Sequence, residues 1–156
     1  MDMNSVVILQ GISGSGKSTV ASKLAPPEAV CSADDTFMVE GKYVFNPARL
    51  PEAHGNCLKK FVALLTGPVK CGIVVDNTNT TVAEIAPYVA LAQAYGRDVT
   101  IVTVPCDPLV AAKRNTHGVP ETACIAMWQR IEQTNKTLPP WWKRVNADEF
   151  LATKAA

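Results

Sequence analysis

The sequence carries almost no excess of charge and has no long hydrophobic run. Among 156 residues there are 15 basic and 14 acidic side chains, which gives a formal net charge of +1. A polyanion would have to be bound by a local group of cations, because there is no global positive field. The first stretch, MDMNSVVILQG, has no basic segment, and its apolar part is too short for a signal peptide or a membrane span. We expect a cytoplasmic protein (in the host cytoplasm if it is viral) with no membrane contact.

Cysteine pairs with metal-binding spacing are also missing. The five cysteines are an odd number and include no C-x-x-C pair, which favours free thiols in a reducing compartment over a disulfide scaffold or a zinc site. The hydrophobic share of 47% and the charged share of 19% are those of an ordinary globular protein, and a chain of this length usually forms one domain. We therefore expect a single domain over residues 1–156.

What the sequence does contain is an alternation of short apolar runs with segments of helical spacing. This alternation predicts an α/β fold, in which a parallel sheet of four to five strands has helices on both faces. The predicted strands are residues 5–10, 29–32, 71–76 and 98–104, with a hairpin over 37–45. The predicted helices are residues 17–25, from 47 or 51 to 66, from the turn at 77–81 to 96, from 108 onward, from 120 to about 134, and a short one that Asn146 caps.

Between the first predicted strand and helix, GISGSGKS (11–18) is a complete match to the G-x-x-x-x-G-K-[ST] motif. Its glycines allow backbone N–H groups to point at a polyphosphate, and the start of the next helix adds its positive dipole end. Lys17 would reach the β- and γ-phosphates, and the Ser18 hydroxyl would bind Mg²⁺. The predicted fold is therefore that of a P-loop NTPase, with ATP and Mg²⁺ as cofactors. The residues expected at ATP are Gly11, Ser13, Gly14, Ser15, Gly16, Lys17, Ser18 and Thr19.

Three classes of P-loop protein can be compared with the rest of the chain. GTPase switches carry a guanine-reading N-K-x-D motif, which this sequence lacks. Motor and AAA-type ATPases usually have longer chains and an acidic pair after the relevant strand, whereas IVVD offers Asp76 alone. A small kinase remains, and such an enzyme needs a base or positioning group near the acceptor hydroxyl.

Adjacent carboxylates in SADDTF (32–37) are the candidates for that group. They follow the second predicted strand, and ligands of doubly wound sheets bind outside the carboxyl ends of the strands. A carboxylate there could accept the hydroxyl proton and orient the oxygen for attack on the γ-phosphate. Aspartate also caps turns very often, so one member of the pair can have that role instead. We expect at least one of Asp34 and Asp35 to be catalytic.

Six segments taken together, GISGSGKST, SADDTF, GKYVFNPARLPEAH, IVVDNTNTT, PYVALAQAYG and KRNTHGVP, resemble the polynucleotide-kinase-like P-loop kinases. The resemblance covers about residues 5 to 132. It implies that Asp34 is the general base and that Asp35 supports the site. It also implies that Asp76 and Asn79 line the acceptor cleft, and that Arg114 is a lid arginine which grips phosphates during transfer.

Two departures from the family pattern bear on the substrate. The resembling kinases have an arginine three residues after the base, where this chain has Phe37, and a second lid arginine, where it reads THG (116–118). An aromatic ring at Phe37 would suit stacking on a base, so we expect Phe37 at the substrate. Trp141 and Trp142, beside two cationic residues, could do the same or could close the core. His54 and His117 are expected in turns or at the surface.

The sequence therefore predicts a kinase that transfers the γ-phosphate of ATP to a hydroxyl of a nucleic acid or nucleotide. The leading acceptor is a polynucleotide 5′-hydroxyl, with DNA as the expected partner. One alternative is a DNA kinase that acts on the hydroxyl of 5-hydroxymethyluracil, as in phage DNA. The other is an ATP-binding regulatory module without transferase activity, against which Asp34 beside a complete phosphate loop counts.

Overall fold

The computed structural model describes residues 1–68 and 71–155, and its elements follow the predicted order. None of the helices in these two ranges combines the length and apolar character that crossing a membrane requires. The strands are β1 (Ser5–Gln10), β2 (Val30–Cys31), β3 (Met38–Val39), β4 (Lys42–Tyr43), β5 (Ile73–Asp76), β6 (Asp98–Thr103) and β7 (Arg144–Asn146). The α-helices are α1 (Lys17–Leu24), α2 (Leu50–Thr66), α3 (Val82–Ala94), α4 (Pro108–Arg114), α5 (Glu121–Asn135) and α6 (Ala147–Ala155). The short 3-10 helices are η1 (Pro27–Ala29), η2 (Ala33–Phe37) and η3 (Pro47–Arg49).

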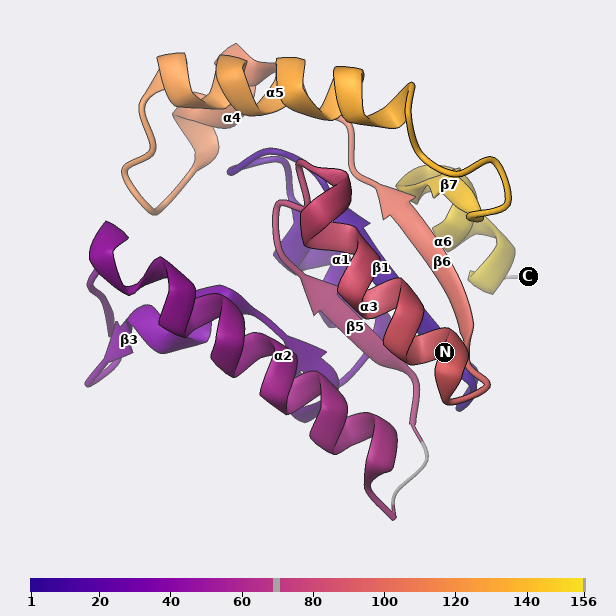
Figure 1. Cartoon of the computed structure of the whole chain (residues 1–156). Helices are drawn as coiled ribbons and strands as arrows, with labels where there is room; N and C mark the ends of the chain where they lie inside the picture. Colours follow the sequence, from indigo (N-terminus) through magenta and orange to yellow (C-terminus); the bar gives the residue numbers. More distant parts are fainter. Residues whose placement is uncertain (69–70, 156) are drawn as a thin grey trace.

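A parallel sheet with the strand order β2-β5-β1-β6-β7 lies at the centre of the molecule (Figure 1). This confirms the predicted sheet of four to five parallel strands. The fifth strand, β7, was not predicted because only one of its three residues is apolar. Because β1 pairs with β5 on one side and β6 on the other, the phosphate loop leaves the sheet at the middle of its carboxyl edge.

Helices cover both faces of the sheet, as predicted. Val6 and Ile8 belong to the apolar cluster that includes α2 and α3, whereas Val7 and Leu9 belong to the one with α1 and α6. The strand period of two sends alternate side chains to opposite faces, so β1 is buried on both sides. Figure 1 places α4 and α5 beyond the ends of the strands, where they form a third cluster with Ile12.

Local capping residues explain where three of the helices begin. A capping box opens α3, in which Thr81 Oγ1 accepts the Glu84 N–H at 3.3 Å and the Glu84 carboxylate accepts the Thr81 N–H at 2.8 Å. Asp107 caps α4 by accepting two backbone N–H groups of its first turn, as its place before a proline predicted. Asn146 caps α6 as predicted, and it accepts the Asp148 N–H at 2.9 Å.

Candidate active site

The phosphate loop connects β1 to α1 in a conformation that depends on glycine. Gly14 and Gly16 have φ angles of 81° and 98°, in the left-handed region that other residues rarely adopt. A Cβ atom on Gly14 would lie 2.2 Å from the backbone oxygen of Ala111 in α4. The loop is therefore packed against α4, and this close approach explains why position 14 requires glycine.

Lys17 lies over the loop and is largely buried. Its Nζ donates a hydrogen bond to the Ile12 carbonyl at 2.9 Å. Burial lowers the pKa of Lys17, while the negative charges of Asp76 and Asp34 act in the opposite direction. Ser15 Oγ is also buried, and within the described residues it has no hydrogen-bond partner. The Lys17 ammonium group beside the loop fits a polyphosphate, which accepts hydrogen bonds and carries negative charge.

A hydroxyl–carboxylate pair stands next to the loop. Ser18 Oγ donates to Asp76 Oδ2 at 2.8 Å, which joins the start of α1 to the end of β5. Burial raises the pKa of Asp76, and the hydrogen bond from Ser18 and the charge of Lys17 oppose that effect. Mg²⁺ prefers oxygen ligands and is usually bound through one or two protein groups together with phosphates and waters. Ser18 and Asp76 therefore fit a Mg²⁺ site, which was predicted at Ser18.

A cleft of about 410 Å³, here called the donor cleft, opens along the phosphate loop. Of the residues predicted at ATP, Gly11 and Ser15 lie buried behind the loop and do not line this cleft. Arg114, at the end of α4, is exposed and does line it. The lining residues are Ser13, Gly14, Gly16, Lys17, Ser18, Thr19, Asp34, Asp76, Asn77, Thr78, Arg114, Asn115, Thr116 and His117.

A second cleft of about 620 Å³, here called the acceptor cleft, adjoins the first. The two clefts share Ser18, Asp34, Asp76 and His117, so these four residues lie at their junction. The rest of the acceptor cleft is lined by the end of α1 and its following turn, the turn after β2, and the β3–β4 hairpin. These further residues are Ala21, Ser22, Lys23, Leu24, Ala25, Pro26, Pro27, Val30, Ser32, Asp35, Met38 and Tyr43.

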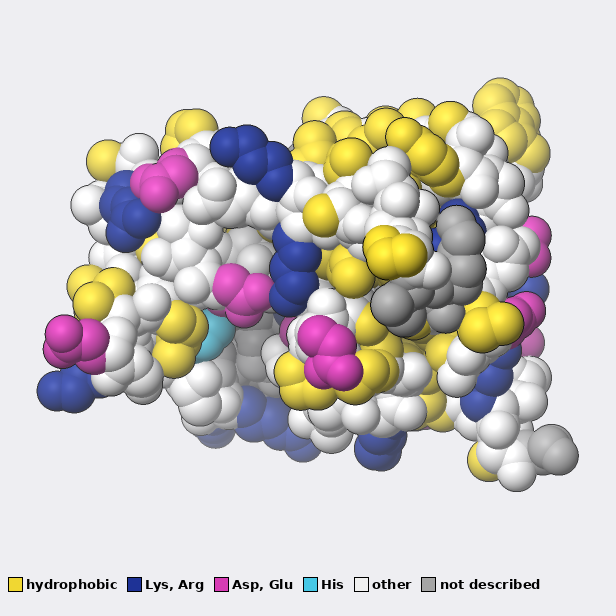
Figure 2. All heavy atoms as spheres, turned by 90° about the horizontal axis from the view of Figure 1, so that it is seen from below, with side chains coloured by type: hydrophobic (Ala, Val, Ile, Leu, Met, Phe, Trp, Pro, Cys, Tyr) yellow, Lys and Arg dark blue, Asp and Glu magenta, His cyan; other side chains and the backbone are white. Residues whose placement is uncertain are grey.

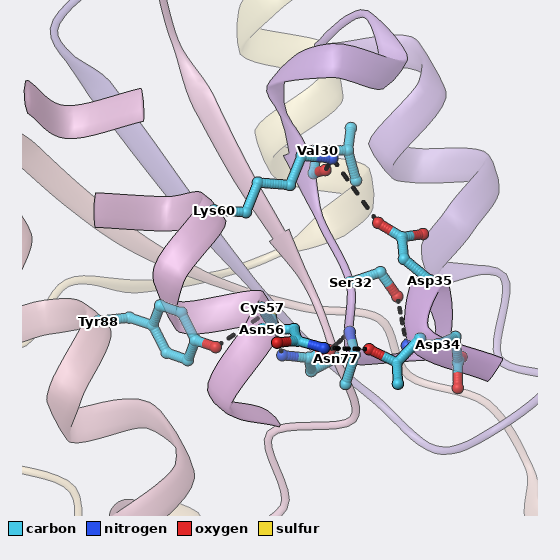
Figure 3. A network of polar contacts seen from close by, with 11 residues as sticks. Val30, Ser32, Asp34, Asp35, Asn56, Cys57, Lys60, Asn77 and Tyr88 are labelled. Atoms are coloured by element: carbon cyan, nitrogen blue, oxygen red, sulfur yellow. Dashed lines mark hydrogen bonds and ion pairs between the residues drawn. The ribbon is translucent and has the colours of Figure 1, made fainter. Parts of the chain in front are cut away.

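The adjacent aspartates lie in η2, directly after β2, and a polar network fixes this turn (Figure 3). Ser32 Oγ accepts the Asp34 N–H at 3.2 Å, and the Ala33 N–H donates to Asn77 Oδ1 at 2.8 Å. Asp35 lies 3.6 Å from Lys60 Nζ of α2, which also donates to the Val30 carbonyl. Asp34 thus lies at the junction of the clefts, whereas Asp35 is tied to α2 and lines only the acceptor cleft.

Tyr43 and His117 surround the Asp34 carboxylate. The Tyr43 hydroxyl donates to Asp34 Oδ1 at 3.0 Å, and His117 Nδ1 lies 3.6 Å from Asp34 Oδ2. The two rings are stacked, with centroids 3.9 Å apart and planes 11° from parallel. Burial and the Asp34 charge raise the pKa of Tyr43, so its hydroxyl stays protonated and can donate. Sequence reasoning assigned neither ring to the site. It expected His117 in a turn or at the surface, where it does lie, and it included Tyr43 only as part of the segment GKYVFNPARLPEAH.

Phe37 and Asn79 were predicted at the substrate, and both predictions are wrong. Phe37 is 1% exposed and packs in the core, where its ring meets the edges of Tyr43 and Phe45. Asn79 is also 1% exposed, and its Nδ2 donates to the Leu9 carbonyl at 2.6 Å. Asn79 therefore holds the end of β1 in place, and neither side chain can reach a molecule in the clefts.

Of the two roles that the sequence left open for the paired tryptophans, the structure shows one, the closing of the core by Trp142. Trp142 is partly buried and packs against the core cluster that includes α2 and α3. Trp141 is 77% exposed and lies on a shallow hollow near α3 and β6, away from both clefts. Neither residue lines the donor or the acceptor cleft, so stacking on a substrate in those clefts cannot come from them.

The model of the AAA_33 family, described as an AAA domain, matches residues 6–121. The chain belongs to this family. The matched range contains the phosphate loop and every residue at the junction of the two clefts.

Several known proteins are similar to the chain in sequence or in fold. Human NEDD4-binding protein 2 is 33% identical over 138 residues, which cover 82% of this chain and 8% of that protein. The crystal structure of the AvrRxo1-ORF1:-ORF2 complex has a TM-score of 0.61 at 17% identity, covering 95% of this chain and 51% of the other. The APS kinase CysC of Mycobacterium tuberculosis, in complex with AMPPNP and APS, has a TM-score of 0.56 at 16% identity and 98% coverage of both chains.

These similarities establish the fold as an α/β P-loop NTPase fold. The chain spans only a small part of the human relative and about half of the AvrRxo1 chain. The narrower resemblance to polynucleotide kinases, and with it the nature of the acceptor, stays a prediction.

Proposed function

We propose that the protein is an ATP-dependent phosphotransferase whose acceptor is a hydroxyl of a nucleic acid or nucleotide, above all the 5′-hydroxyl of a DNA end. The position of Asp34 is the observation that carries this proposal. Its carboxylate lies where the donor and acceptor clefts meet, next to the Ser18–Asp76 pair. A carboxylate at that point can touch an acceptor hydroxyl and the phosphate that receives it.

In the proposed reaction Asp34 takes the proton of the acceptor hydroxyl. The hydroxyl oxygen forms a bond to the γ-phosphorus of ATP, the bond to the β–γ bridging oxygen breaks, and ADP leaves. Lys17 and the loop N–H groups hold the β- and γ-phosphates, while Arg114 neutralises charge that develops during transfer. Ser18 and Asp76 would bind Mg²⁺, which supplies further charge neutralisation between the phosphates.

The charge distribution supports recognition of a chain end rather than of a long polyanion. Among the described residues that line the acceptor cleft, Lys23 is the one lysine or arginine. Over the wider surface, the face in Figure 2 carries both basic and acidic side chains, in line with the formal net charge of +1. A protein that follows many phosphates uses a positively charged groove. A cleft that holds one terminal nucleotide requires much less positive charge.

The test is incubation with γ-labelled ATP and a panel of acceptors. The panel contains 5′-hydroxyl DNA and RNA oligonucleotides, DNA with 5-hydroxymethyluracil and free nucleosides, and the control protein is Lys17→Ala. We expect label on the 5′-hydroxyl DNA, with none in the control. Label only on 5-hydroxymethyluracil DNA would show that the acceptor is the hydroxyl of that base and not a 5′-hydroxyl end. ATP binding without transfer to any hydroxyl would refute the enzymatic proposal and favour a regulatory module.

A further inference from the structure

The stacked pair of Tyr43 and His117 lies on the acceptor side of Asp34. Tyr43 comes from β4 and His117 from the connection between α4 and α5, and both residues line the acceptor cleft. Together they contact both carboxylate oxygens of Asp34, one through a hydrogen bond and the other through a 3.6 Å approach, while 49% of the Asp34 side chain stays exposed. An acceptor hydroxyl that takes the position beside Asp34 Oδ2 now held by His117 has to displace that side chain.

His117 is the member of the pair that can move at lower cost. Tyr43 belongs to a strand and packs its ring against Phe37 and Phe45, with centroid distances of 6.0 Å and 6.4 Å. His117 is followed by Gly118, whose φ is 69°, in a connection without regular structure. Displacing His117 breaks its 3.6 Å contact with Asp34 and its stacking on Tyr43, whereas displacing Tyr43 would open part of the core.

We propose that Tyr43 is the platform for a planar ring of the acceptor, and that His117 occupies this position until the acceptor binds. With ring centroids 3.9 Å apart there is no room for a third ring between them, so the substrate ring replaces His117 on the Tyr43 face. The acceptor hydroxyl then takes the place of His117 beside Asp34 Oδ2. This inference rests on the proposed function for the presence of the hydroxyl, and it names the acceptor class as an alcohol joined to an aromatic base.

The two parts of the Tyr43 side chain have separable roles. The ring supplies the stacking surface, and base–aromatic stacking is sequence-tolerant because every base has a π-face. The hydroxyl holds Asp34 Oδ1, which leaves Oδ2 directed at the acceptor. Tyr43 is thus a specificity residue through its ring and a positioning residue through its hydroxyl. Removing the ring should weaken acceptor binding, whereas removing the hydroxyl alone should lower kcat.

Binding of two oligonucleotides tests the ring platform directly. One carries a normal thymidine at its 5′-hydroxyl end, and the other has an abasic sugar there. Affinities are measured with Mg²⁺ and a non-hydrolysable ATP analogue, so the result does not depend on phosphate transfer. The wild-type protein should prefer the thymidine end by roughly 5- to 100-fold, the range that corresponds to stacking of one base. Equal affinity for the two ends, or binding of neither, would overturn the inference.

Four variants test which residue causes the preference for the thymidine end. Tyr43→Leu should lose this preference, and Tyr43→Phe should keep it with a reduced kcat. His117→Ala should keep or increase it, because a competitor for the platform is gone. Tyr95→Leu, at an exposed tyrosine outside both clefts, is the matched control and should behave as wild type. An unchanged preference in Tyr43→Leu contradicts the assignment, even if the enzyme is active.

A variant-free measurement guards against misfolding of Tyr43→Leu. A 5′-terminal 5-iodouridine, irradiated on the wild-type protein, should form its main crosslink at Tyr43, and mass spectrometry of the peptides identifies the site. Crosslinks confined to other residues would refute the platform. Failure of phosphate transfer with a crosslink at Tyr43 would leave the ring site in place and refute only the kinase proposal.

Discussion

Replacement of Asp34 by asparagine separates proton transfer from positioning. The amide keeps an oxygen that can accept the Tyr43 hydroxyl, which lies 3.0 Å from Asp34 Oδ1 in the structure. A hydrogen bond to a neutral acceptor contributes about 1 kcal/mol less than one to a charged acceptor. The fold should therefore survive with a small loss of stability. An amide cannot accept a proton from the acceptor, so kcat should fall by roughly 10²- to 10⁴-fold, which is the usual contribution of general acid–base groups.

The neighbouring carboxylate supplies the control for Asp34→Asn. The side chain of Asp35 is 62% exposed, whereas that of Asp34 is 49% exposed. The charged partner of Asp35 is Lys60, whose Nζ lies 3.6 Å from its carboxylate. Asp35→Asn changes the same chemical group one residue away, and we expect a small effect on kcat. Steady-state kinetics and ATP binding are measured for both variants with the best acceptor of the panel. A large loss at Asp35 with a small loss at Asp34 would reverse the assignment, and small losses at both would remove base catalysis from the pair.

Three further variants test other parts of the site. Lys17→Ala should abolish transfer in a folded protein, because Lys17 is the point charge placed on the β- and γ-phosphates; near-normal turnover would refute the loop assignment. Arg114→Ala should lower kcat more than it raises the KM for ATP, and a change in KM alone would limit Arg114 to ground-state binding. Phe37→Ala should cost about 3–5 kcal/mol of stability in denaturant unfolding, as for other buried phenylalanines, and a loss below ~1 kcal/mol would contradict its place in the core.

Much of the fold could be predicted from the sequence because its signals are local. The runs SVVILQ and IVVD are apolar enough to indicate buried parallel strands, and the predicted edges of β1, β5 and β6 lie within two residues of those found. Proline, glycine and capping residues likewise set the helix limits. β7 was not predicted, because a three-residue edge strand with one apolar side chain carries no such signal.

Site residues could be predicted where a motif fixes the backbone. The predictions failed where tertiary packing decides the direction of a side chain. The phosphate loop, Asp34 and Arg114 lie at the clefts because each follows a strand or ends a helix at the same edge of the sheet. The direction in which a side chain leaves a short 3-10 turn depends on what packs behind it. Phe37 turns inward and joins the core cluster to which the apolar face of α2 contributes. The stacking of Tyr43 on His117 joins residues 74 positions apart, which spacing alone does not reveal.

The inward position of Phe37 also explains how the site can present an aromatic ring without that residue. The Phe37 carbonyl accepts the Val44 N–H at 2.8 Å. The Phe37 ring packs against Tyr43 and Phe45, the two neighbours of Val44 in the sequence. These contacts hold the β3–β4 hairpin at the mouth of the acceptor cleft, with Tyr43 directed at Asp34. An arginine at position 37 could not be buried there without a paired charge. Compared with the polynucleotide-kinase-like pattern, the chain has no arginine at position 37, and the Phe37 ring supports the aromatic face of Tyr43 instead. We therefore propose an acceptor recognised by its base rather than by its phosphate.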